Sequence, residues 1–203
     1  MSTPERRARR TQAERSATTR AALLAAGREL FGERGFAASG REEIVRRAGV
    51  TRGALYHHFA DKEDLFRAVM EQLEAEVMHR VAVAAMQSDD PVEQLRLGAQ
   101  AYLDAALDPS VSRVCIVDAP AVLPADVRRE ISDRFAHGQV REVLTAIGAA
   151  GRIPAELVEP LTDVVLSGVM AAAQHVALAD SPEQARRDAG AAVDLLISGL
   201  TTS

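Results

Sequence analysis

The residues best suited to hold a polyanion are gathered in one stretch, between Thr51 and Lys62. Arg52 stands near its start, where a guanidinium can donate two hydrogen bonds to guanine O6 and N7. Gly53 and Ala54 follow and are small enough to let the backbone approach a DNA groove, and the Ala54 methyl can touch a thymine methyl. The residue types and their order indicate contact with base edges.

The same stretch holds side chains that suit phosphates. Tyr56, His57 and His58 offer hydrogen-bond donors to phosphates or base edges. Lys62 is the only lysine of the chain and follows Asp61, a residue type that caps helix N-termini. Backbone N–H groups, the positive end of a helix and the ammonium together predict an anion site for one phosphate.

Metal binding and catalysis are the rival interpretations of these residues. Either His57 or His58 can share a helix face with Asp61, but such a pair supplies two protein ligands, which are too few for a closed zinc site. No glycine-rich phosphate loop, G-x-S-x-G or H-E-x-x-H motif occurs. Cys115, the only cysteine, has no base near it in sequence and is expected in the core. The sequence therefore predicts no enzyme, no metal and no cofactor.

Charge is divided unevenly along the chain. The net charge is −5, but residues 1–67 hold 13 Arg and one Lys against nine Asp and Glu, which gives +5, and residues 68–203 hold 10 Arg against 20 Asp and Glu, which gives −10. Unless the charges cluster by chance, a basic head on an acidic body indicates a polyanionic partner for the head only. The basic start is followed by no apolar secretory segment, and no apolar run is long enough to predict a transmembrane helix, so we expect a cytoplasmic protein.

Two short helices joined by a tight turn are expected to position these residues. Ser39 and Glu42 form a capping-box pattern that opens a helix ending at Ala48, and Thr51 caps a second helix that ends near Phe59. Gly49 lies in the turn between them. This is the helix-turn-helix pattern, whose second helix enters the DNA major groove.

The whole chain is predicted to be all-α, with about nine helices. Alanine and leucine favour helix, and aromatic residues are only 3% of the sequence. Besides the two short helices, turn residues separate helices expected at about 16–34, 62–87, 92–107, 111–119, 125–149, 155–178 and 183–200. The expected division is a flexible basic arm at 1–15, which is a solvated tail or a DNA-contacting segment, a DNA-binding domain at 16–66, and a ligand-binding and dimerisation domain at 67–203.

Residues 16–66, with the strings AALLAAGRELFGERGF and IVRRAGVTRGALYHHFADKEDLF, closely resemble the N-terminal domain of TetR/AcrR-family transcriptional repressors. The resemblance implies an all-helical homodimer with a three-helix DNA-binding head and a larger body, in which a bound small molecule respaces the two heads and releases the operator. It also implies site residues. Base-facing positions are Arg52, Gly53, Ala54, His57 and His58, and phosphate-contacting positions are Ser39, Thr51, Tyr56 and Lys62.

Two departures from the family pattern lie in the first helix of the motif. Ser39-Gly40-Arg41 stands where the family usually has Thr-Ser-apolar, so either the first turn shifts or Arg41 turns outward toward DNA. Val45 replaces a usual alanine at a tight helix contact. The expected contacts at 39–41 are the ones that these departures affect.

In the body, polar residues in apolar surroundings and soft apolar neighbours are the candidates for a ligand pocket, because such sites combine few polar groups with an apolar lining. They are Met86, Tyr102, Cys115, Asp118, Phe135, His137, Met170, Gln174 and His175. Each has the alternative of an ordinary core or surface residue. Small residues on broad apolar faces at 155–178 and 183–200 indicate a dimer interface, or else cover the core of the same chain.

The sequence thus predicts a homodimeric repressor that a small-molecule effector releases from a double-stranded, palindromic DNA operator. A twofold dimer places two recognition helices about 34–36 Å apart, one turn of DNA. The alternative is a weakly specific, nucleoid-type protein that uses the same head without an effector.

Overall fold

The computed structural model describes the backbone of residues 4–200 and the side chains of residues 12–200, and this part of the chain is helical without a strand. Its nine continuous helical segments match the number expected. They are α1 (Pro4–Ala38), α2 (Arg41–Ala48), α3 (Arg52–His58), α4 (Lys62–Ala85), α5 (Pro91–Ala105), α6–η1–α7 (Pro109–Val111, Ser112–Asp118, Ala119–Val122), α8–η2–α9 (Ala125–Ser132, Asp133–His137, Gly138–Ala149), η3–α10 (Ala155–Leu157, Val158–Leu178) and α11 (Pro182–Gly199).

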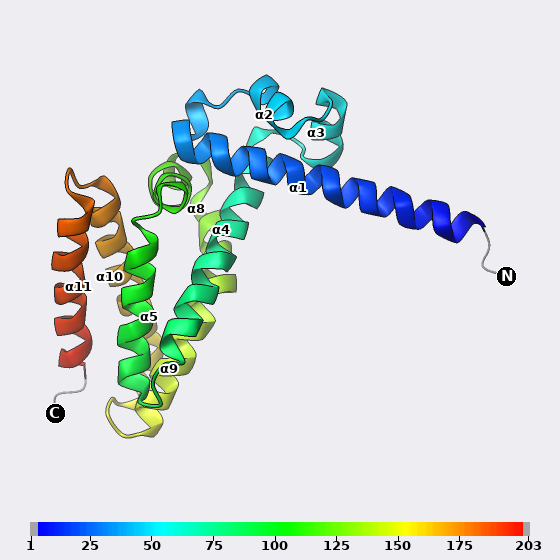
Figure 1. Ribbon diagram of the computed structural model, residues 1–203. Coiled ribbons are helices and arrows are strands. Elements are labelled where there is room, and N and C mark those ends of the chain that lie inside the picture. Colours follow the sequence, from blue (N-terminus) through cyan, green and yellow to red (C-terminus); the bar gives the residue numbers. More distant parts are fainter. Residues whose placement is uncertain (1–3, 201–203) are drawn as a thin grey trace.

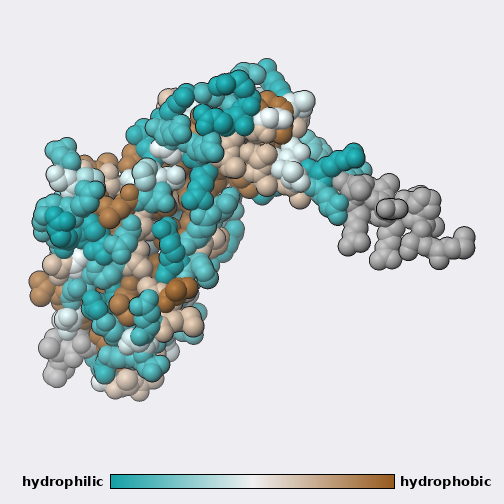
Figure 2. Space-filling view, viewed as in Figure 1, coloured by the Kyte–Doolittle hydropathy of each residue, from teal (hydrophilic) through white to brown (hydrophobic). Residues whose placement is uncertain are grey.

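The helices form a head and a body (Figure 1). Helices α1, α2 and α3 make the head, and α4 runs from it into the body, where α5, α9, α10 and α11 lie along one another. In the same orientation, Figure 2 shows hydrophilic residues over much of the head and patches of hydrophobic residues among polar ones on the body.

Helix α1 differs from expectation at its start. We expected a flexible arm over residues 1–15, but the backbone is helical from Pro4, so most of that segment continues α1. Arg, Ala, Gln and Glu are good helix formers, and adding residues to an existing helix avoids the cost of nucleation. Residues 1–3 and the side chains of residues 4–11, which include four of the basic arm's arginines, lie outside the described part.

The apolar core joins the head to the body. Phe66 of α4 meets the rings of Phe31 and Phe36 edge-on, with centroids 5.3 and 5.2 Å apart. The same buried cluster extends to Val114 of η1 and Ile131 of α8. Because apolar contact is continuous from one part to the other, the position of the head depends on how the body packs.

Two helical segments of the body are π-helical, η1 at Ser112–Asp118 and η2 at Asp133–His137. Periodicity predicted helices there but could not show the wider turns. Such turns are frequent at functional sites in other proteins.

Candidate nucleic-acid interface and ligand cavity

The turn between α2 and α3 has the geometry that its sequence predicts. Gly49 adopts a left-handed conformation (φ 66°) and its N–H donates to the carbonyl of Arg46, while the Val50 N–H donates to that of Val45. Thr51 caps α3, because its Oγ1 accepts a hydrogen bond from the Ala54 N–H at 3.2 Å. The predicted helix-turn-helix is confirmed, although α2 begins after Gly40 without the expected Ser39 cap.

Helix α3 is held from one side and free on the other. Leu55 is buried, as are Phe59 just after the helix and Ile44 on α2. The opposite face carries Arg52, exposed like Glu42 of α2, with 3.2 Å between its Nη1 and the Glu42 Oε1. A solvent-exposed pair of this kind contributes little stability. The guanidinium can therefore exchange the carboxylate for another acceptor.

Arg41 adds a second guanidinium to this exposed face. Its Nη1 donates a hydrogen bond to the Tyr56 hydroxyl at 3.1 Å. The guanidinium carbon of Arg52 lies over the Tyr56 ring, 5.8 Å from the ring centroid. The hydrogen bond from Arg41, and then the proximity of Arg52, lower the pKa of Tyr56. Of the two outcomes foreseen for Arg41, the structure shows the outward one.

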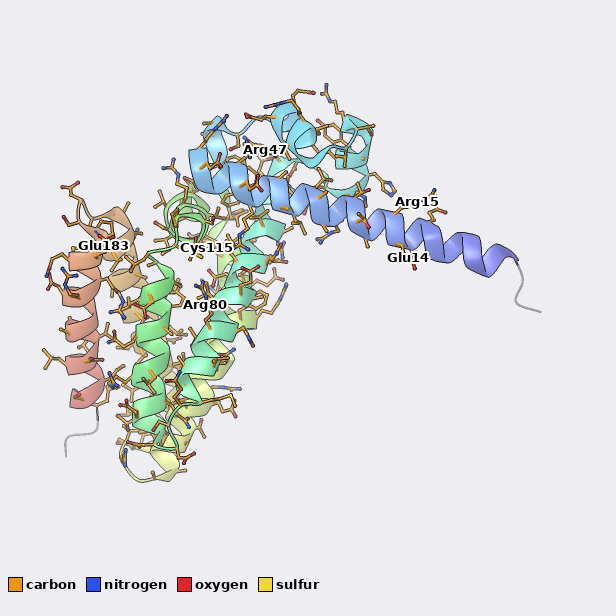
Figure 3. The ribbon with its side chains drawn as sticks, in the orientation of Figure 1. Glu14, Arg15, Arg47, Arg80, Cys115 and Glu183 are labelled. Carbon is orange, nitrogen blue, oxygen red and sulfur yellow. The ribbon has the colours of Figure 1, made fainter. Side chains whose placement is uncertain are left out.

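The two histidines lie at the end of α3 beside the projecting part of α1. Their rings meet edge-on, 5.1 Å apart. Partial burial, and then the neighbouring His57 and Arg20, lower the pKa of His58, so its ring is neutral near neutral pH. His57, His58 and Ala54 form one wall of a groove whose other wall is α1, from Gln12 to Thr19, and Figure 3 shows Arg15 on this part of α1.

Ser39 does not occupy the phosphate-contacting position that the family resemblance implies. Its side chain is fully buried, and its hydroxyl lies 2.7 Å from the carbonyl oxygen of Gly35 and 3.0 Å from that of Leu30. The hydroxyl has one proton to share between these two carbonyls. Both carbonyls lie near the end of α1, where Gly35 adopts a left-handed conformation (φ 79°). Ser39 thus holds the connection to α2.

Lys62 is also turned inward. Its Nζ donates to the carbonyls of Phe36 at 2.9 Å and Ser39 at 3.3 Å, and it lies 3.9 Å from the centroid of the Phe36 ring. The ammonium therefore ties the start of α4 to the α1–α2 connection, and the expected phosphate contact would require it to leave these acceptors. Among the phosphate candidates, Thr51 and Tyr56 remain exposed.

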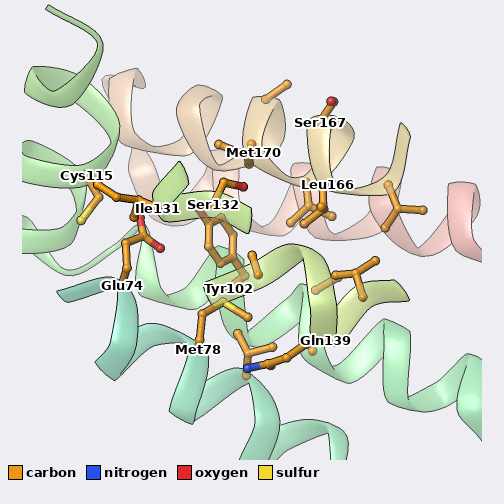
Figure 4. Close-up of a pocket in the computed structure, with 18 of the residues that line it drawn as sticks. Glu74, Met78, Tyr102, Cys115, Ile131, Ser132, Gln139, Leu166, Ser167 and Met170 are labelled. Atoms are coloured by element: carbon orange, nitrogen blue, oxygen red, sulfur yellow. The ribbon is translucent and has the colours of Figure 1, made fainter. Parts of the chain in front are cut away.

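A cavity of about 440 Å³ lies inside the body (Figure 4). Helices α4, α5, α8, α9 and α10 form its walls together with η1 and η2, and most of the lining is Val, Leu, Ala, Ile and Met. The polar lining side chains include Glu74, Tyr102, Ser132 and Gln139. Size, apolar lining and a few polar groups fit a small-molecule site.

The structure places some of the predicted pocket residues in this cavity and others elsewhere. Tyr102, Cys115, Met170 and Gln174 line it. The remaining five do not line it. Met86 is 83% exposed at the end of α4, and His175 is exposed on α10. Phe135 packs on the core shared with the head, His137 lies 3.6 Å from Asp163, and Asp118 faces the head. Helix periodicity could not separate these inward and outward faces without the crossing angles of the helices.

Comparison with known proteins covers both parts of the chain. Residues 23–69 match the model of the bacterial regulatory proteins of the tetR family, and residues 92–200, more than half of the chain, match the tetracyclin repressor-like C-terminal domain. The chain belongs to the TetR family.

Solved and curated relatives agree with this membership. A TetR-family transcriptional regulator from Pectobacterium atrosepticum is 30% identical, with a TM-score of 0.80 over 94% of this chain and 97% of that one. The HTH-type transcriptional regulator CymR of Pseudomonas putida is 33% identical over 63% of this chain and 65% of its own length. The repressor BepR of Brucella suis is 52% identical over 30% of this chain and 29% of its own length. The matches thus span less than two thirds of these curated relatives.

In this TetR-family chain, Asp118 joins the head to the body. Its Oδ2 accepts a hydrogen bond from the backbone N–H of Phe36 at 2.6 Å, and its Oδ1 lies 3.3 Å from Nε of Arg113. The Arg113 guanidinium packs against Gly35, so closely that a Cβ at Gly35 would lie 2.5 Å from Nη2. The π-helical η1 therefore contacts the end of α1 through Asp118 and Arg113, and lines the cavity through Cys115 and Ile116.

Glu74 is one of the cavity residues that the sequence did not lead us to expect, as are Ser132 and Gln139. A signal was present, since Met70, Glu74 and Met78 recur every four residues and so form one stripe of α4, in which the carboxyl interrupts an apolar face. Burial raises the pKa of Glu74 to about 7, and the neighbouring Cys115 thiol acts against this shift. Burial likewise raises the pKa of Tyr102 and of Cys115, so both stay protonated near neutral pH.

Proposed function

We propose that this protein is a dimeric, sequence-specific DNA-binding repressor that leaves a palindromic operator when a small molecule enters the body cavity. The observation that carries the proposal is the exposed face of α3. It presents Arg52, Gly53 and His57 outward, next to the hydroxyl of Thr51 and the Arg41–Tyr56 pair. Each of these groups is bound weakly or not at all within the head, so DNA can replace solvent and surface partners at small cost.

Within this proposal, Arg52 reads a guanine, while Gly53 and Ala54 let the backbone approach the groove floor. His57 and His58 face the neighbouring bases. Thr51 and Tyr56 bind phosphates, and we add Arg41, whose guanidinium shares the Tyr56 hydroxyl. Lys62 and Ser39 support the head from inside.

The contacts of η1 supply a physical route for release. Cys115 and Ile116 face the cavity, and Asp118 of the same segment binds the Phe36 N–H at the end of α1. A ligand that displaces η1 therefore pulls on the α1–α2 connection and turns the head relative to the body. In a twofold dimer, a small rotation of each head changes the spacing of the recognition helices.

Helices α10 and α11 are the proposed dimer interface. Val164, Met170, Leu178, Leu195 and Leu196 are large apolar side chains exposed on these two helices. The helical segment 155–178 is long and apolar enough to cross a membrane, judged by length and composition alone. Within one chain, 17% of an apolar 18-residue stretch of this segment is buried. An apolar face left uncovered in this way on a two-helix surface fits pairing with a second copy.

The base-reading role is tested by selecting preferred duplexes for wild type, Arg52→Ala and Arg129→Ala. Arg52→Ala should lose about 1–3 kcal/mol on the preferred site and relax base preference at one position in each half-site. Arg129 is exposed on α8, in the body, so its variant removes the same charge and should keep the preference. An unchanged base preference in Arg52→Ala would refute the assigned role.

A further inference from the structure

Several of the polar residues that line the cavity lie together at one end of it. Figure 4 shows Glu74, Cys115, Tyr102 and Ser132 close together, with Gln139 and Leu166 toward the other end. Within the described part of the chain, the Cys115 thiol is the one side chain that acts on the Glu74 carboxyl, and no hydrogen bond within the protein engages the Tyr102 or Ser132 hydroxyl. Three oxygen-bearing side chains thus face a space of molecular size without being satisfied by the protein.

No cation pairs with Glu74 among the side chains of residues 12–200. Arg28, whose charge acts on the Cys115 thiol, is paired with Glu76 at 2.7 Å. Arg128 of α8 lines the cavity, but it is not among the groups that act on the Glu74 carboxyl. A carboxylate in an apolar cavity is costly unless it is paired, so a bound cation would gain a strong, desolvated partner.

The surroundings of Glu74 also favour a cation. The Tyr102 and Ser132 hydroxyl oxygens can accept hydrogen bonds from an ammonium, and the thioethers of Met70 and Met78 are polarisable neighbours on α4. Residues 68–203, which hold 10 Arg against 20 Asp and Glu, give the body an excess of negative charge that attracts cations. A carboxylate ligand would meet the unpaired Glu74 as a like charge.

Arg128 marks a second polar position. Its Nε is buried and has no hydrogen-bond partner in the described chain. Because it is a donor, it needs an acceptor such as a carbonyl or ether oxygen. One molecule can satisfy both positions if it carries an amine and, apart from it, such an oxygen.

We propose that the cavity binds a lipophilic amine, whose ammonium donates to Glu74, Tyr102 and Ser132 while its apolar part fills the Met- and Val-lined remainder. An acceptor oxygen on the same molecule meets the Nε of Arg128. The regulatory meaning of this site rests on the proposed function, but the binding itself does not.

The test uses three probes with the same alkyl chain: decylamine, decanol and decanoate. Decylamine and decanoate are kept below their micelle-forming concentrations and decanol below its solubility limit. Calorimetry and thermal shift on the full chain should show decylamine binding at least about tenfold more tightly than decanol, with decanoate the weakest. Glu74→Gln should abolish the preference for the amine. Glu142→Gln removes the same charge from an exposed position on α9 and should keep the preference for the amine.

A pH series gives a second readout. Cys115 from η1 and Tyr102 from α5 are the titratable groups that face the carboxyl, and both stay protonated near neutral pH. Arg128 from α8 lines the same cavity and stays charged. Decylamine should therefore bind more tightly at about pH 8 than at about pH 6, as Glu74 ionises, and Glu74→Gln should flatten this dependence.

Decanoate binding as tightly as decylamine, an amine affinity that Glu74→Gln leaves unchanged, or no decylamine binding at all would overturn the amine site. The proposed function has a separate readout, the release of bound DNA. Decylamine that binds without releasing DNA leaves the site standing and contradicts effector control. Release of DNA by decanoate alone supports effector control and contradicts the amine site.

Discussion

At the scale of single residues, Lys62 holds the start of α4 to the α1–α2 connection. Replacing it with Met leaves the Ser39 carbonyl without its hydrogen-bond partner and should lower the free energy of unfolding by about 1–3 kcal/mol. Urea denaturation measures this loss. DNA affinity measured against salt concentration should keep its slope, because the ammonium is held by the carbonyls of Phe36 and Ser39.

Arg129→Ala serves as the control for Lys62→Met, since it removes one positive charge from an exposed position. The opposite pattern, unchanged stability with a salt slope smaller by about one, would restore the phosphate role that the family resemblance implies.

Glu74 makes stability depend on pH. Its pKa of about 7 in the folded protein lies above its ordinary value of 4.5, so the unfolded chain releases the proton first and ionisation in the folded state is unfavourable. Stability should fall as pH rises through this interval, by on the order of 2 kcal/mol between about pH 5 and about pH 8. Glu74→Gln should lack this part of the dependence, and parallel pH curves for variant and wild type would show that the carboxyl is not buried as described.

At the scale of elements, η1 connects the cavity to the head through Asp118. In Asp118→Asn the charge-assisted bond to the Phe36 N–H is weakened and the ion pair with Arg113 is lost. The Phe36 amide should exchange with deuterium faster by about tenfold or more, as measured by NMR. The control Asp126→Asn, at an exposed position on α8, should leave the Phe36 amide protected. Equal protection of this amide in both variants would remove Asp118 from the proposed route of release.

The elements themselves could be predicted from the sequence to a large extent. Glycines, prolines and caps such as Thr51 and Asp61 fix helix ends locally, so the order of the nine helical segments and the helix-turn-helix agree with expectation. The inward turn of Lys62 and the place of Asp118 depend on contacts between segments 23 to 82 residues apart. Local patterns carry no information on such contacts.

At the scale of the whole molecule, the exposed faces of α10 and α11 are expected to pair two chains. Leu195 and Leu196 are 76% and 65% exposed in the single chain. Replacing both with Glu should bury charges in the interface and give a species of one-chain mass, 21.7 kDa, by light scattering. Met86→Glu, at the end of α4 away from these helices, should stay dimeric, and a dimer in the double variant would move the interface elsewhere.

The central claim is sequence-specific binding of a symmetric operator, and selection from random duplex DNA by the full chain tests it most directly. We predict enrichment of one palindrome whose half-sites are centred about one helical turn apart. The two heads of one dimer then bind the same face of the DNA. Salt-dependent binding that enriches no palindrome would contradict the claim and favour a weakly specific, nucleoid-type protein.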